Sequence, residues 1–121
     1  MNAHLFYFIL ENYKYMIERK AIFISEDKLT NIFSENKTLV VFDLENNHVI
    51  AVETIVLKKK FNSTEEILHY LQRKYINLVY VSEMDIETEI KFSNFNIKVK
   101  TESMLNDDKL LNTIYFSPPH F

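Results

Sequence analysis

The stretch LVVFDLENNHVIAVETIVL, residues 39–57, decides the fold class of this chain. Two runs rich in β-branched residues, 39–45 and 48–57, flank Asn46 and Asn47. Asparagine tolerates the left-handed backbone that a tight hairpin turn requires, so the stretch predicts a β-hairpin. Both faces of its strands are mostly apolar, and such strands need cover on both sides. The hairpin therefore predicts a sheet with helices above and below it.

The chain after the hairpin alternates between helical and strand patterns. Ser63 and Glu66 form a capping box, and Ile67, Leu71 and Tyr75 follow at helical spacing. The elements predicted after this helix are a strand at 76–81, a helix at 85–95 capped by Asp85, a strand at 97–100 and a helix from about 106 to 115.

The chain before the hairpin is less clearly patterned. Residues 21–25 (AIFIS) predict a short buried strand. In residues 1–19 the apolar side chains recur at helical spacing, which favours a helix, although the run 5–10 fits a buried strand equally well. We expect 1–19 to be an N-terminal extension, 20–116 a single α/β domain and 117–121 a C-terminal tail.

The order of these elements predicts a three-layer α/β/α domain with a mixed five-stranded sheet. Strands that are joined through helices should lie parallel, connected by right-handed crossovers. The hairpin should add antiparallel pairing to the same sheet.

Composition excludes several classes of function. The 121 residues include no cysteine, which excludes disulfides, thiolate metal sites and a cysteine nucleophile. They include no glycine either, so phosphate-cradling loops, nucleophile elbows and dinucleotide fingerprints cannot exist in their usual form. The net charge is −3 and the positive residues are scattered, which argues against nucleic-acid binding.

The apolar run at residues 5–10 resembles neither a signal peptide nor a membrane span. No basic region precedes it, and Glu11 and Lys14 follow soon after. We therefore expect a cytoplasmic protein that has no membrane partner.

Two stretches carry a resemblance to a known family. One is Ile32-Phe33-Ser34 followed by 37–43 (KTLVVFD); the other is 76–81 (INLVYV), the loop Ser82-Glu83-Met84-Asp85, a helix and 96–99 (NIKV). Over roughly residues 20–115 this pattern resembles the small domain that binds iron–molybdenum cofactor and its precursors in nitrogenase assembly. The resemblance implies a ribonuclease H-like fold, with a cofactor-binding site at Phe33, Ser34, Ser82, Glu83, Met84 and Asp85.

The family's own motif residues are replaced in this chain. Its His-Phe-Gly tripeptide is here Ile32-Phe33-Ser34, its glycine loop is Ser82 to Asp85, and a glycine before the last strand is Asn96. The histidine-rich loop after the hairpin is here 58–62 (KKKFN). A metal cluster would find few ligands, so we expect the fold without the cofactor and predict no metal ligand and no catalytic residue.

Three functions remain open. The first is a non-enzymatic protein-interaction or regulatory module with an eroded ligand site, whose partner is another protein or a second copy of the chain. The second is a domain that binds a small molecule or metal cofactor beside Phe33 and Ser82 to Asp85. The third is a metal-dependent phosphodiester hydrolase, which requires Asp43, Glu83 and Asp85 to converge at one end of the sheet.

Overall fold

The computed structural model describes residues 17–58 and 60–109 of the chain. The expectations for residues 1–16 and for the tail at 117–121 lie outside these ranges. The described elements are β1 (Ile17–Ser25), β2 (Lys28–Leu29), β3 (Lys37–Glu45), β4 (His48–Leu57), α2 (Thr64–Arg73), β5 (Leu78–Val81), α3 (Ile86–Asn94), β6 (Lys98–Thr101) and the 3₁₀ helix η1 (Glu102–Asp107).

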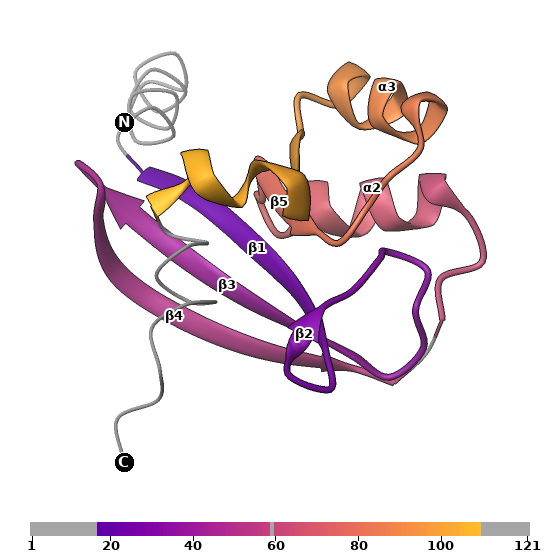
Figure 1. The fold of residues 1–121 in the computed structure, drawn as a ribbon, viewed down its shortest axis with the longest axis horizontal. Coiled ribbons are helices and arrows are strands. Elements are labelled where there is room, and N and C mark those ends of the chain that lie inside the picture. Colours follow the sequence, from indigo (N-terminus) through magenta and orange to yellow (C-terminus); the bar gives the residue numbers. More distant parts are fainter. Residues whose placement is uncertain (1–16, 59, 110–121) are drawn as a thin grey trace, which may run out of the picture.

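The sheet is mixed, and its main path has the strand order β4-β3-β1-β5-β6 (Figure 1). Strand β3 runs antiparallel to both β1 and β4, whereas β1, β5 and β6 run parallel to one another. The short strand β2 pairs with the end of β1. The expected α/β class with a mixed five-stranded sheet is confirmed. Strand β1 begins already at Ile17, within the stretch that we assigned to the N-terminal extension.

The hairpin of β3 and β4 forms as its sequence predicts. Asn46 and Asn47 have φ angles of 51° and 66°, and Glu45 pairs with His48 across the turn. Both residues of the turn therefore adopt the left-handed conformation, which asparagine tolerates at low cost.

Side-chain caps fix where the two described α-helices begin. The hydroxyl of Ser63 accepts a hydrogen bond from the Glu66 backbone N–H at 3.2 Å, and the carboxylate of Glu66 accepts from the N–H of Asn62 at 2.9 Å. The reciprocal bond of the capping box thus goes one residue earlier than in the usual motif. Asp85 caps α3 by accepting from the N–H of Thr88 at 2.8 Å.

Positive φ angles occur at the ends of both α-helices, where glycine commonly stands. Tyr75 follows α2 and Asn96 follows α3, and each has a φ of 59°. These residues lie just beyond the caps Lys74 and Phe95. Asparagine is a common substitute for glycine in this position, whereas tyrosine is strained there.

The main hydrophobic core lies between one face of the sheet and the two α-helices. Strands β1, β3 and β5 contribute alternate residues, and α2 and α3 contribute their apolar sides. The fully buried members include Ala21, Phe23, Leu39, Val41, Ile67, Leu68, Leu71, Val79, Val81 and Phe92.

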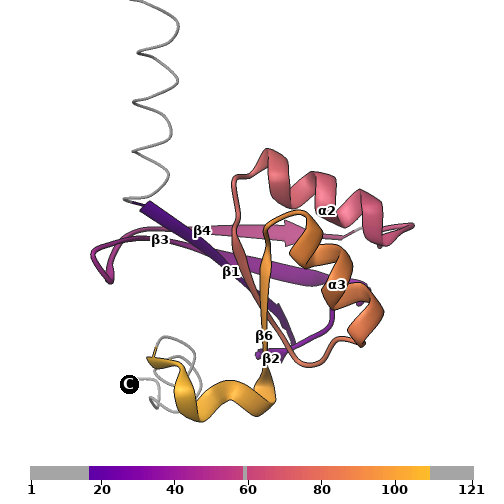
Figure 2. The same ribbon diagram turned by 90° about the horizontal axis from the view of Figure 1, so that it is seen from above.

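A smaller cluster of Ile22, Leu29, Leu78 and Tyr80 lies on the other face of the sheet. Within the described residues α2 and α3 both pack against the first face, so the α-helical layer expected on the other face is not found among them. The 3₁₀ helix η1 lies at the end of β6 on the side away from α2 (Figure 2). Most of the helix predicted at 106–115 lies outside the described residues, and residues 102–107 form a 3₁₀ helix that the sequence analysis did not predict. No helix among the described residues is long and apolar enough to cross a membrane.

Candidate functional site

The two loops singled out by the sequence lie side by side. The backbone N–H of Ser82 donates to the carbonyl of Thr30 at 3.1 Å, which joins the loop after β5 to the loop after β2. Between them is an open pocket of about 470 Å³. Its lining residues are Asn31, Ile32, Phe33, Glu83, Met84, Asp85 and Thr88. Four of the six predicted site residues, Phe33, Glu83, Met84 and Asp85, therefore line one pocket.

The remaining two predicted residues, Ser34 and Ser82, are not among the lining residues of this pocket. The Ser34 hydroxyl shares a hydrogen bond with the Thr30 hydroxyl, and it donates to the Asn31 side-chain oxygen at 3.2 Å. Asn31 also accepts from the backbone N–H of Phe33 at 2.9 Å. These bonds shape the first loop, so Ser34 supports the conformation of Phe33.

The carboxylate of Asp85 is engaged by α3. Hydrogen bonds from the Thr88 backbone and hydroxyl lower the pKa of Asp85, so the carboxylate is charged at neutral pH. Among the described residues, no group of three or more His, Cys, Asp or Glu side chains is arranged to hold a metal ion. The pocket combines three apolar residues, Ile32, Phe33 and Met84, with the acidic residues Glu83 and Asp85.

Asp43 lies at the other end of the sheet. It pairs with Arg19 in the β1–β3 register, and the next residue, Lys20, pairs with Leu78 at the start of β5. Glu83 and Asp85 instead follow Val81 at the end of β5. Because β3 runs antiparallel to β5, the carboxyl ends of these strands lie at opposite edges of the sheet. The three carboxylates proposed for a hydrolase do not converge.

Asp43 belongs instead to a network around Arg19. The Arg19 guanidinium donates to Asp43 at 2.7 Å and to Glu53 of β4 at 3.2 Å. It also donates to the carbonyl of Lys74 at the end of α2. Arg19 thus ties β3, β4 and α2 together, a role that the linear sequence does not signal.

Lys37, whose exposed fraction is 0%, was not among the residues expected from the sequence to be buried or functional. Its ammonium group donates to the carbonyl of Ser34 at 2.8 Å and lies 4.8 Å from the centre of the Phe61 ring. Burial, and secondarily the charge of Lys60, lower the pKa of Lys37. The sequence contains one sign of this burial. Side chains alternate between the two faces of a strand, so Lys37 lies on the same face as the apolar residues Leu39 and Val41.

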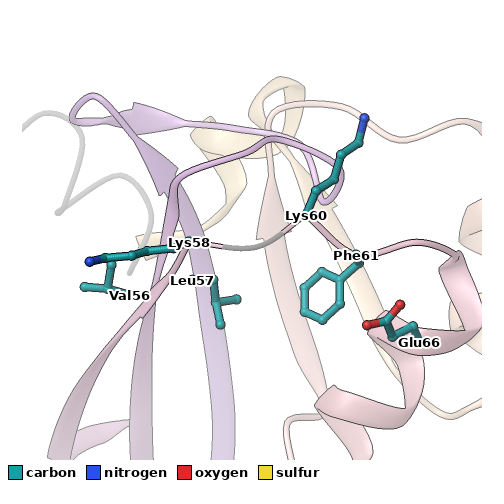
Figure 3. A pocket seen from close by; sticks show the side chains of 6 residues that line it. All are labelled: Val56, Leu57, Lys58, Lys60, Phe61 and Glu66. Atoms are coloured by element: carbon teal, nitrogen blue, oxygen red, sulfur yellow. The ribbon is translucent and has the colours of Figure 1, made fainter.

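A second open pocket, of about 430 Å³, lies at the end of β4 and is lined by Val56, Leu57, Lys58, Lys60, Phe61 and Glu66. Figure 3 shows Lys58 and Lys60 extending in different directions, away from each other. The Glu66 carboxylate lies close to the Phe61 ring (Figure 3) and accepts from the N–H of Asn62. The lysines therefore do not converge on an anion.

Strand β4 is the most exposed element of the sheet. It is ten residues long and lies at the outer edge, paired with β3 on one side (Figure 1). Ile55 and Leu57 turn toward the main core, so the alternate residues Val52, Thr54 and Val56 face the other way. Val52 is 56% exposed and Val56 is 63% exposed. Among the residues that the structure describes, strand β4 thus presents both an open backbone edge and an apolar row.

These features define a small α/β domain with a mixed sheet, an open pocket beyond the carboxyl end of β5 and an exposed apolar edge strand. A solved structure, the crystal structure of PH0822, is similar to it with a TM-score of 0.56 and 19% sequence identity. The similarity covers 69% of this chain and 75% of that chain. At this level of identity it establishes the fold alone. No protein-family model and no curated protein matches the chain.

Proposed function

We propose that this chain is a non-enzymatic protein-interaction module whose partner binds along β4. The observation that carries this proposal is the exposure of Val52 and Val56 on a ten-residue edge strand. An edge strand offers unpaired N–H and C=O groups to a second strand, and recognition by strand addition uses those groups together with alternate side chains.

The composition of β4 supports this use of its edge. Natural proteins commonly protect an exposed edge with lysine, proline or inward-facing charges. Residues 48–57 (HVIAVETIVL) contain neither lysine nor proline. Their one acidic residue, Glu53, is paired with Arg19 at 3.2 Å. The first lysine of this region, Lys58, stands beyond the end of the strand. Between the register shift at Asp43/Leu44 and Lys58, the edge thus has neither lysine nor proline, and its one inward-facing charge is paired within the chain. Such an edge is typical of a surface that a partner covers.

The resemblance to the nitrogenase cofactor-binding domain forms the second part of the proposal. In this account the chain is a divergent relative, with a ribonuclease H-like fold, whose ligand site has been lost. The position of the loop pocket beyond the carboxyl end of β5 supports the relationship, since open α/β sheets commonly bind ligands at that place. The replacement of the family's histidine by Ile32, which is buried, supports the loss of the ligand.

A small-molecule binding domain is the alternative function. The pocket of about 470 Å³ between Phe33 and Met84 favours it, because the volume is in the range of known ligand sites. The ligand would be apolar or cationic, since Glu83 and Asp85 border the pocket.

A selection of displayed random peptides against the full chain separates the two proposals. The interaction module predicts extended peptides with apolar residues at alternate positions, whose addition shifts the amide resonances of β4. Val52→Lys should abolish their binding, while Ile90→Lys, at an equally exposed apolar residue on α3, should not. Peptides that shift only the resonances of residues 31–34 and 82–88, or that bind Val52→Lys equally well, contradict the proposal.

A further inference from the structure

We infer that the partner of β4 is a second copy of this chain, joined by antiparallel pairing of the two β4 strands about a two-fold axis at Thr54. This inference rests on the proposed function and names its partner. The pairing continues one sheet across both copies and removes the open edge from each. Two-fold pairing requires a strand whose side chains match their own reversed order.

The residues of β4 that face away from the main core, Val52, Thr54 and Val56, meet this requirement. With Thr54 opposite Thr54 of the second copy, Val52 lies opposite Val56, and the same contact recurs on the other side of the axis. The exposed fractions of Val52 and Val56, 56% and 63%, show how much apolar surface remains to be covered in one chain. A Thr–Thr pair directly opposite across two strands is among the favourable cross-strand pairs, and each Val52–Val56 pair removes apolar surface from water.

The residues of β4 that face the core side of the sheet, Glu53 and Ile55, distinguish the register with its axis at Thr54 from the register with its axis at Glu53. An axis at Glu53 would place the two Glu53 carboxylates directly opposite each other, which is unfavourable for like charges. With the axis at Thr54, Glu53 lies opposite Ile55 and remains beside Arg19 of its own chain, at 3.2 Å. The register at Thr54 thus brings no like charges together along the strand.

The charges at the two ends of the strand favour the antiparallel direction. The hairpin end of β4 is His48, which pairs with Glu45 of β3, and the opposite end continues into Lys58 and Lys60. In the antiparallel arrangement the lysines of one copy lie at the hairpin end of the other, where Glu45 stands one strand away in β3. In a parallel arrangement the lysines of both copies would lie together and repel.

Cysteine cross-linking tests the axis directly, because the chain has no cysteine of its own. In the full-length Thr54→Cys variant the two thiols meet at the axis, so mild oxidation should give a disulfide-linked dimer in high yield. The control Ile90→Cys, on exposed α3, should stay mostly monomeric under the same conditions. Equal cross-linking of both variants, or none at position 54, overturns the inference.

Sedimentation equilibrium of the full chain provides the second readout. The wild type should show twice the mass of one 14.5 kDa chain. Val52→Lys should raise the dissociation constant at least about tenfold, since the substitution occurs twice across the axis. Ile90→Lys should leave the constant unchanged. If the wild type stays monomeric at every concentration, the inference that a second copy binds β4 is overturned. The proposed function fails separately, if neither a selected peptide nor a second copy binds β4.

Discussion

The ammonium group of Lys37 lies 4.8 Å from the centre of the Phe61 ring, inside the protein. Lys37 begins β3 and Phe61 precedes α2, so the contact joins the start of the hairpin to the segment that follows it. The same ammonium donates to the carbonyl of Ser34 at 2.8 Å. One buried cation thus connects the loop that carries Phe33 with the segment that carries Phe61.

Lys37 should make the stability of the protein depend on pH in the alkaline range. Its pKa in the folded protein is lowered from the ordinary 10.5, so between the two values the unfolded chain binds more protons. The free energy of unfolding should therefore rise with pH through this range as the cost of burying the charge disappears. Urea denaturation from pH 7 to pH 10 measures this rise.

Lys37→Met is the matched variant, because it keeps the length of the side chain without the charge. Its stability relative to the wild type should fall as the pH rises, since only the wild type gains from deprotonation. A constant difference between the two proteins across this range would falsify the assignment of a buried, charged Lys37.

The Ser63 cap should contribute to stability in a way that a second serine does not. Ser63→Ala removes the acceptor for the Glu66 N–H and should cost about 1 kcal/mol. Ser93→Ala, at an exposed position inside α3, should be neutral or slightly stabilising because alanine favours helix. Thermal and chemical denaturation of both variants provides the comparison, and equal effects would argue against a specific cap.

Replacing Tyr75 with glycine should increase the stability of the protein. Its φ of 59° is strained for a residue with a β-carbon, and glycine relieves the strain at an entropic cost in the unfolded chain. Tyr75→Gly should therefore stabilise the protein by up to about 1 kcal/mol. Asn96→Gly, at the same φ, should gain less, because asparagine already tolerates this conformation. A gain at Asn96 that exceeds the one at Tyr75 would contradict this ranking.

The hydroxyl of Tyr80 should anchor the segment that follows β6. Tyr80 is fully buried and donates to the carboxylate of Asp108 at 2.9 Å, and Lys100 donates to the same oxygen at 2.7 Å. Burial and the bond to Asp108 raise the pKa of Tyr80, so the phenol stays protonated. Tyr80→Phe should cost roughly 1.5–3 kcal/mol, the range for hydrogen bonds to charged groups.

Tyr70→Phe provides the control for this substitution, since the Tyr70 ring lies against Phe61 and its contact does not depend on the hydroxyl. Denaturant titration should show a much smaller loss for Tyr70→Phe. Hydrogen exchange of residues 101–108 should accelerate in Tyr80→Phe alone. Unchanged exchange there would mean that Tyr80 does not hold this segment.

The features predicted correctly from sequence are those that depend on near neighbours. The turn at Asn46 and Asn47 and the caps at Ser63 and Asp85 each act within a few residues, so their chemistry is readable in the linear sequence. The mixed sheet followed from the hairpin and from the helices between strands. Four of the six residues predicted for the site line one pocket because both loops lie at the same edge of the sheet, while binding at this pocket stays a prediction.

The features missed depend on pairing across the sheet. The hydrolase hypothesis required Asp43 to lie near Asp85, but the antiparallel direction of β3 places Asp43 beside Arg19 at the opposite edge. The burial of Lys37 depends on Phe61, which is distant in sequence. The exposure of β4 depends on the strand order, because the same apolar pattern would be buried in a central strand.

The most direct test of the central claim is amide hydrogen exchange in β4 as a function of protein concentration. A second copy that pairs with the edge should protect alternate amides of residues 50–58 at high concentration and release them on dilution. The same amides should exchange rapidly at all concentrations in Val52→Lys. If these alternate amides exchange rapidly in the wild type too, at every protein concentration, β4 is not the surface that joins two copies of this chain.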